Sequence, residues 1–238
     1  MPATLITGAN RGLGLEFVRQ YANDGWKVIA CCREPDQATD LNALAAGRPG
    51  GVELQALDVT DGASVAALAG RLAGRPIDLL VNNAGRGGQP GTDTLGSIDY
   101  ELWQELLAAN TLGPMRVTEA LIENVAASQS KRVVTLSSGL GSLSWLANEK
   151  ITGFGAAYQY RSSKAAVNCA MLALAHQVKP RGITVVLFSP GWVRTDMGGP
   201  NAPLSAEESI ASLRKTIAGL SLEQSGRFLD HDGTEIAW

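Results

Sequence analysis

Seven short apolar runs, separated by longer segments with helical spacing, are the feature of this sequence that most restricts its fold. Parallel strands must be joined by crossover connections, and those crossovers are usually helices. The alternation therefore predicts an α/β protein built on a doubly wound parallel sheet, with helices on both faces. The runs expected to form strands are residues 4–9, 27–33, 52–60, 77–85, 132–138, 183–191 and 226–230.

The bulk properties of the chain exclude several functional classes. Its 238 residues are enough for one large domain, and we expect a single domain over residues 1–238. A net charge of -3 without a long basic run argues against nucleic-acid binding. The sequence lacks a signal-peptide pattern and any run approaching ~18 apolar residues, so we expect a cytoplasmic protein without integral membrane association. Two histidines and three unsuitably spaced cysteines argue against a metal site.

A glycine-rich stretch, TGANRGLG (7–14), lies between the first expected strand and the first expected helix. Gly8, Gly12 and Gly14 carry no Cβ that would keep the backbone away from a pyrophosphate. The helix that follows offers free N–H groups and the positive end of its dipole. An ordinary strand-to-helix turn also uses glycine, but the position of this one favours nucleotide binding.

The second expected strand indicates which nucleotide would be preferred. A site for NAD usually places a carboxylate near the end of this strand to bind the ribose 2′-hydroxyl, whereas this chain has Cys32 and Arg33 there. Arg11, within the glycine turn, offers a second guanidinium suited to phosphate oxygens. The alternative for either arginine alone is a solvated surface charge. Together they predict NADP(H) as the cofactor.

Two tyrosines and one lysine in AAYQYRSSKAAVN (156–168) form a candidate proton donor. Residues four apart share a helix face, so Tyr160 lies over Lys164 while Tyr158 lies over Ser162. A phenol with a pKa of ~10 is a poor proton carrier at neutral pH. We expect the Lys164 ammonium and a cationic nicotinamide to lower the pKa of Tyr160. By itself, this spacing is a hypothesis, because it also arises by chance.

Other polar residues are expected at the same edge of the sheet. Ser137 and Ser138 end the fifth strand, and because neighbouring residues alternate faces, only one of them can orient a substrate carbonyl. The stretch LLVNNAG ends the fourth strand, where its amides can line a ribose and nicotinamide. Asn110 precedes Gly113 and Pro114, where a bent helix could free a carbonyl for a proton-relay water. An ordinary polar contact inside a helix is the alternative for Asn110.

Taken in order, these motifs resemble the short-chain dehydrogenase/reductase family, whose fold is a single Rossmann-like domain. The resemblance rests on TGANRGLG, LDVTD, NNAG, Asn110, SS, YRSSK and SPGWVRTDM, which span nearly the whole chain. It implies that Ser138 rather than Ser137 orients the carbonyl, and that Lys164 binds ribose hydroxyls. The implied catalytic residues are Asn110, Ser138, Tyr160 and Lys164. The implied cofactor contacts are Gly8, Asn10, Arg11, Gly12, Leu13, Gly14, Arg33, Asp58, Val59, Asn82, Ala84, Gly85, Tyr160, Lys164, Pro190, Gly191, Val193 and Thr195.

The segments around SPGWVRTDMGGPNAP and SGRFLDHDGTEIAW look more narrowly like the C-factor and sniffer-type carbonyl reductases. That resemblance implies NADPH-dependent reduction of an aldehyde or ketone, with Tyr160 donating the proton. The alternative is a cofactor-binding signalling or redox-sensor protein with incidental turnover, because C-factor is also a signalling protein. Trp145 and Trp192 are candidates for an apolar substrate wall, with ordinary packing as the alternative. The apolar faces of residues 164–178 predict a homodimer.

Overall fold

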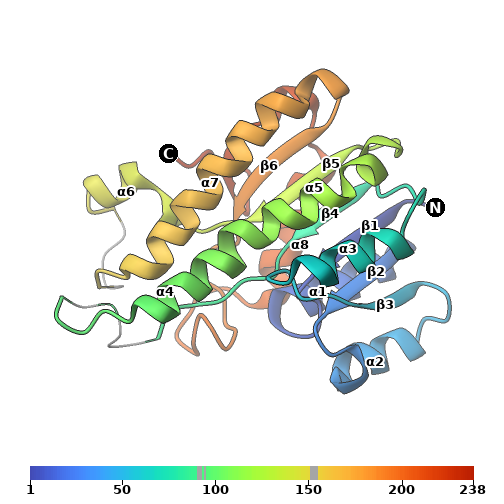
Figure 1. Ribbon diagram of the computed structural model, residues 1–238, viewed down its shortest axis with the longest axis horizontal. Coiled ribbons are helices and arrows are strands. Elements are labelled where there is room, and N and C mark those ends of the chain that lie inside the picture. The colour runs from blue at the N-terminus through green and yellow to red at the C-terminus, as the bar shows by residue number, and fades with distance from the viewer. Residues whose placement is uncertain (90–92, 94, 151–154) are drawn as a thin grey trace.

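A parallel sheet of seven strands, in the order β3-β2-β1-β4-β5-β6-β7, crosses the molecule (Figure 1). The computed structural model describes the whole chain except residues 90–92, 94 and 151–154. The predicted α/β class and parallel sheet are confirmed. The strands are β1 (Ala3–Thr7), β2 (Lys27–Cys32), β3 (Val52–Ala56), β4 (Leu79–Asn82), β5 (Arg132–Leu136), β6 (Thr184–Ser189) and β7 (Phe228–Asp230).

Helices cover both faces of this sheet, as Figure 1 shows. On one face α3 packs against α5, and α5 and α4 pack against α7, while on the other face α1 packs against α8 and α2. In the described part of the chain, no helix has the length and apolar character needed to cross a membrane. The helices are α1 (Gly12–Asn23), α2 (Thr39–Ala46), α3 (Gly62–Arg71), α4 (Tyr100–Leu107), α5 (Gly113–Ala126), α6 (Leu143–Ala147), α7 (Tyr158–Val178) and α8 (Ala206–Ala218).

Two apolar cores lie on the two faces of the sheet because successive strand residues point to opposite sides. In β1, Leu5 belongs to the core beneath α3, α5 and α7, whereas Ile6 belongs to the core beneath α1, α2 and α8. Val133 and Val134 of β5 divide in the same way. Both faces of the central strands are therefore buried, which explains why β1, β4, β5 and β6 are largely apolar, whereas the edge strand β3 has no buried residue.

The strand order reverses between β1 and β4, which are direct neighbours although β2 and β3 lie between them in the chain. In an open parallel sheet, ligands bind outside the carboxyl ends of the strands at such a switch point. The strands end earlier than predicted, at Thr7 and Asn82 for these two. The residues of these two runs that follow the strands form the loops at this edge, where the candidate site lies.

Candidate active site

The glycine turn after β1 is held against the end of β4 by close backbone contacts. Gly8 has a φ of +65°, and a Cβ there would lie 2.9 Å from the Ala84 Cα. A Cβ on Gly14 would overlap the Gly8 carbonyl oxygen and lie 2.6 Å from Asn83 Nδ2. Asn83 Nδ2 donates to the carbonyls of Thr7 at 2.8 Å and Gly8 at 3.1 Å. These glycines are therefore required by the packing of the turn itself.

The N-terminus of α1 faces outward from this turn and has the properties of an anion site. Among the described residues, Arg11 at the N-cap supplies no side-chain acceptor, and the first turn contains no acidic residue. The first N–H groups of α1 therefore remain available as donors to a phosphate. Asn10 and Leu13, also expected to contact the cofactor, belong to the same turn and the start of α1.

Arg11 forms an ion pair with a residue of the loop after β6. Its Nη1 lies 2.6 Å from Asp196 Oδ2, on the loop after β6, and the two side chains are 70% and 79% exposed. A Cβ on Gly12 would lie 3.7 Å from the Thr195 Cγ2, so the two loops also touch beside this pair. An ion pair this exposed is worth at most ~1 kcal/mol, so Arg11 can exchange Asp196 for a phosphate.

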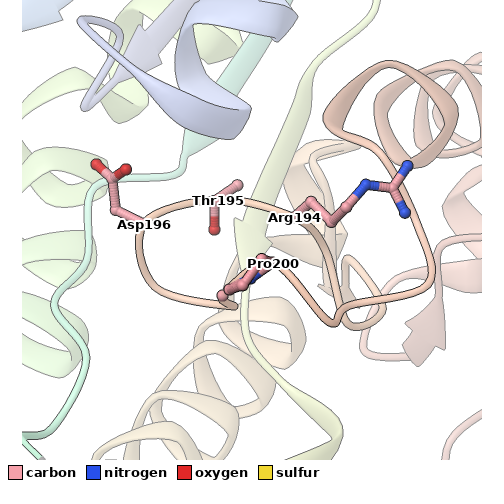
Figure 2. A pocket seen from close by; sticks show the side chains of 5 residues that line it. Arg194, Thr195, Asp196 and Pro200 are labelled. Atoms are coloured by element: carbon pink, nitrogen blue, oxygen red, sulfur yellow. The ribbon is translucent and has the colours of Figure 1, made fainter.

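The loop after β6 lines a hollow of about 360 Å³ that is open to solvent. Figure 2 shows Arg194 and Asp196 pointing away from each other along this loop, with Thr195 between them. Gly198 N donates to Thr195 Oγ1 at 3.2 Å, which fixes this hydroxyl within the loop. The hollow is lined by Arg194, Thr195, Asp196, Gly199 and Pro200.

The other residues of this loop that are expected to contact the cofactor are held by neighbouring parts of the protein. Pro190 O accepts a 2.7 Å hydrogen bond from Ser209 Oγ of α8, and Val193 is buried. Gly191 has a φ of +78°, and a Cβ there would lie 2.6 Å from Leu204 Cδ1 and 3.1 Å from His231 Cδ2. Contacts with Ser209 of α8, Leu204 and His231 thus hold the backbone after β6 in place.

The end of β2 presents the cation expected for a 2′-phosphate. Arg33 is exposed, whereas Cys32, where an NAD site would carry an acid, is buried. Hydrogen bonds from Thr60 lower the pKa of Asp58, and the charge of Arg33 lowers it further. Arg33 therefore lies near the residues expected at the adenine. Val59 is buried against the start of α5, where a Cβ on Gly113 would lie 2.8 Å from Val59 Cγ2.

The two serines after β5 point to opposite sides, as the strand alternation requires. Ser137 is buried, and its Oγ donates to Asn168 Oδ1 at 2.5 Å. Ser138 instead forms a hydrogen bond with the hydroxyl of Tyr160, and its Oγ accepts from Leu140 N at 3.2 Å. The structure therefore brings Ser138, the serine implied by the family resemblance, to Tyr160.

Tyr160 and Lys164 share a face of α7, with the lysine Nζ 5.7 Å from the centre of the tyrosine ring. The lowered pKa expected for Tyr160 is wrong for the protein chain alone. Burial raises the pKa of Tyr160 to about 12, and the hydrogen bond with Ser138 offsets this only in part. Burial also lowers the pKa of Lys164 to about 8, and its Nζ donates to Leu136 O at 2.9 Å. Tyr158 lies at the surface.

Asn110 lies in a wide helical turn rather than at a bend caused by Pro114. Residues Ala108–Leu112 form a π-helix between α4 and α5, and Pro114 falls in the first turn of α5. Asn110 Oδ1 accepts from Arg86 N at 2.7 Å, and its Nδ2 donates to Arg86 O at 2.9 Å and Ser163 Oγ at 3.0 Å. The side chain therefore holds the loop after β4.

Gly85 lies close to both Asn110 and Lys164. A Cβ on Gly85 would lie 3.1 Å from Asn110 Oδ1 and 3.7 Å from Lys164 Nζ. The four residues expected to be catalytic are thus linked through short contacts at the carboxyl edge of β4 and β5.

The sequence did not reveal the structural roles of Asn83 and Ser163 at this edge. The side chain of Asn82, expected along the cofactor, is buried, and its Nδ2 donates to Thr118 Oγ1 and Thr135 Oγ1. Its neighbour Asn83 is the amide that braces the glycine turn. Ser163, one residue before Lys164, supports Asn110. Strand alternation in NNAG is a signal that only one of the two asparagines faces the turn, but it does not say which.

The two tryptophans proposed as a substrate wall have different surroundings. Trp192 is 44% exposed, and its Nε1 donates at 2.7 Å to the carbonyl of Gly198, the residue before Gly199 of the hollow. Trp145 of α6 is half-buried, packs against the core beneath α7 and carries Lys150 Nζ 4.7 Å from its ring centre. Trp192 is thus exposed near the hollow, whereas Trp145 packs against the core, and the substrate wall stays a prediction.

Comparison with known proteins supports the resemblance found in the sequence. The family description "short chain dehydrogenase" matches residues 2–204. C-signal from Myxococcus xanthus is 43% identical over 163 residues, covering 68% of this chain and 93% of that protein.

Two solved structures share the complete fold. NADPH-bound carbonyl reductase from chicken fatty liver is 32% identical and superposes with a TM-score of 0.91, covering 100% of this chain and 99% of the other. Carbonyl reductase Sniffer of D. melanogaster is 30% identical, with a TM-score of 0.89 and 100% of both chains covered. The predicted C-factor and sniffer-like branch is confirmed by these similarities.

Proposed function

This chain belongs to the short-chain dehydrogenase family, and from that premise we propose that it is an NADPH-dependent oxidoreductase that reduces an aldehyde or ketone. The observation that carries the proposal is the contact between Tyr160, Ser138 and Lys164 at the carboxyl edge of the sheet. A proton donor, a second hydroxyl and a cation are the groups that carbonyl reduction requires there.

The residues around the glycine turn fit the cofactor. The N-terminus of α1 offers N–H donors for the pyrophosphate, and Arg33 with Arg11 offers guanidinium groups for a 2′-phosphate. Lys164, beside Gly85, would hold the ribose hydroxyls, and Thr195 would hold the carboxamide. When bound, NADPH supplies the hydride that the protein itself cannot provide.

Side chains of the protein itself donate the proton and stabilise the charge that its release leaves behind. With a pKa raised to about 12, Tyr160 stays protonated at neutral pH, as a donor to a carbonyl oxygen must. Ser138 orients that oxygen by a hydrogen bond. The Lys164 ammonium stabilises the phenolate left on Tyr160 after it has released its proton. Asn110 holds the Arg86 backbone, and with it the loop that lies over Lys164.

A screen of NADPH oxidation against aldehydes, quinones and cyclic ketones tests this proposal. We expect turnover of at least one carbonyl class, and turnover that is lost in Tyr160→Phe. The alternative function, a cofactor-binding signalling or redox-sensor protein, is favoured by the similarity to C-signal. Tight NADPH binding without turnover across the panel would support that alternative and contradict the reductase.

The Arg33→Asp variant tests the choice of cofactor. Losing a charge-assisted bond of ~1.5–3 kcal/mol should lower the preference for NADPH over NADH by about 10- to 100-fold. The measurement is the ratio of kcat/KM for the two cofactors at one saturating carbonyl. Lys27→Asp, at the opposite end of β2, makes the same charge change away from the site and should leave the ratio unaltered. An unchanged ratio in Arg33→Asp would contradict the assignment.

The pH dependence of NADPH use should report Lys164. The pKa of this buried amine is lowered to about 8, so the ammonium is present below that pH and is lost above it. We expect kcat/KM for NADPH, which reflects the free enzyme, to fall about tenfold per pH unit above the pKa. Tyr160, with a higher pKa, remains protonated throughout this range.

The Lys164→Arg variant is the control for this profile. It should have lower activity and no decline near pH 8, because guanidinium does not titrate there. A parent profile that stays flat to pH 10 would refute this role.

We also propose a homodimer through α7, whose inner face packs on the sheet with Val167 and Met171 while its outer face includes exposed Cys169.

A further inference from the structure

Residues 237 and 238 bind the segment that follows Ser138. Ser142 Oγ donates to Ala237 O at 2.5 Å, and Ser144 N donates to Trp238 O at 2.7 Å. The same Ser142 Oγ accepts from Trp145 N at 3.0 Å and so caps α6. Both contacts join parts of the chain that are more than 90 residues apart, so this segment and α6 hold each other in place.

The segment containing Trp238 is itself fixed to the edge of the sheet. Ile236 is buried in the core beneath α7, and its N–H donates to Phe228 O of β7 at 2.8 Å. The rings of Phe228 and Trp238 are stacked, with their centres 5.5 Å apart and an angle of 30° between their planes. Trp238 therefore continues a segment that is anchored to β7 and to the core, and α6 is attached to that segment.

A short chain of contacts leads from α6 back to Ser138. Gly141 N donates to Ser138 O at 2.8 Å, and Ser142 N donates to Gly139 O at 3.0 Å, so residues 138–142 form one tight turn. A Cβ on Gly141 would lie 2.9 Å from Lys164 Cβ, so this turn is wedged against α7. A shift of Ser142 would consequently be transmitted to the Ser138 hydroxyl.

We propose that Trp238 is a positioning residue for Ser138. Its main-chain oxygen binds Ser144 N, and its ring, stacked on Phe228, fixes the adjacent Ala237 whose carbonyl binds Ser142. These contacts keep the turn after β5 on α7 and the Ser138 hydroxyl against Tyr160. The inference rests on the proposed reductase function. Cofactor binding should depend on Trp238 only weakly, because the proposed phosphate contacts follow β1 and β2, and Lys164, which would hold the ribose hydroxyls, belongs to α7 and not to the turn.

The Trp238→Ala variant removes the ring stacked on Phe228 and tests this role. A displacement of a reacting group by about 1 Å can cost up to 10²-fold, and we expect a 10- to 100-fold loss of kcat with an aromatic aldehyde. The Kd for NADPH should change less than twofold. Trp238→Phe keeps a stacked ring and should restore most of the rate. Ser142→Ala, which loses one hydroxyl, should reproduce part of the loss.

Trp26→Ala is the matched control. Like Trp238, which is 40% exposed, Trp26 packs against an aromatic ring, that of Tyr21 at 4.9 Å, but it is half-buried and belongs to the core on the other face of the sheet. It should leave kcat unchanged. An equal loss of kcat in Trp26→Ala, a weakened NADPH Kd in Trp238→Ala, or full activity in Trp238→Ala would each overturn the proposal.

Amide hydrogen exchange provides a readout that does not depend on turnover. In Trp238→Ala, residues 139–147 should exchange faster than in the parent, while the glycine turn at 8–14 stays unchanged. If the parent reduces no carbonyl but the exchange result holds, the reductase function fails and the positioning contact stands. Unchanged exchange over 139–147 would overturn the positioning role whatever the activity.

Discussion

Replacing Tyr160 by phenylalanine should lower the rate of carbonyl reduction by about 10³-fold, within the range that a positioned proton donor contributes. The variant keeps the ring above Lys164 and removes only the hydroxyl that bonds to Ser138. Because burial raises the pKa of this phenol to about 12, nearly all of it is protonated at pH 7 in the parent. The loss should therefore reflect the missing proton and not an altered protonation state.

The experiment is a comparison of kcat with one carbonyl substrate, together with the Kd for NADPH by fluorescence titration. Tyr158→Phe is the matched control, since it makes the same change two residues away on an exposed position. It should retain parental kcat. Tyr160→Phe should keep the parental Kd, because its ring remains in place. Parental kcat in Tyr160→Phe would refute Tyr160 as the proton donor.

Adding one methyl group at Gly14 should have the largest effect on the fold of the site. The new Cβ would overlap the Gly8 carbonyl oxygen and press on Asn83 Nδ2, so the turn would have to move away from β4. Overpacking of this kind costs ~1–3 kcal/mol or more. A loss of about 3 kcal/mol would lower Tm by ~6–12 °C in a chain of this size. NADPH affinity should fall as well, because the N–H groups at the start of α1 are displaced.

Gly70→Ala is the control for this change, because both glycines lie within helices. A Cβ on Gly70 in α3 meets nothing within 4 Å, so alanine should stabilise the helix by up to ~1 kcal/mol. Calorimetric Tm values would thus move in opposite directions in the two variants. If Gly14→Ala melts at the parental temperature, the close approach between the turn and β4 is not a constraint on the fold.

The family resemblance and the local patterns predicted much of the architecture. Seven apolar runs predicted the seven strands, most directly for the central ones, because a strand buried on both faces must be apolar along its length. The position of TGANRGLG between β1 and α1 predicted the tight turn. The spacing of Tyr160 and Lys164 predicted their common face, because helical periodicity depends only on neighbouring residues.

Long-range contacts decided the rest. Strand alternation required Ser137 and Ser138 to point apart, but only the partners Asn168 and Tyr160, brought there by α7, determined which serine faces the site. The direction of the pKa shift of Tyr160 likewise depended on burial by distant segments, which spacing along a helix does not reveal.

The sequence by itself therefore determined the element types, their order and the residues offered at the edge of the sheet, since these follow from periodicity and backbone preference. Only the tertiary structure decided that Asn83 rather than Asn82 braces the glycine turn, and that Ala237 and Trp238 bind Ser142 and Ser144 after the Ser138 turn. These contacts join segments from 75 to more than 90 residues apart, and no local pattern specifies which distant partner a side chain will meet.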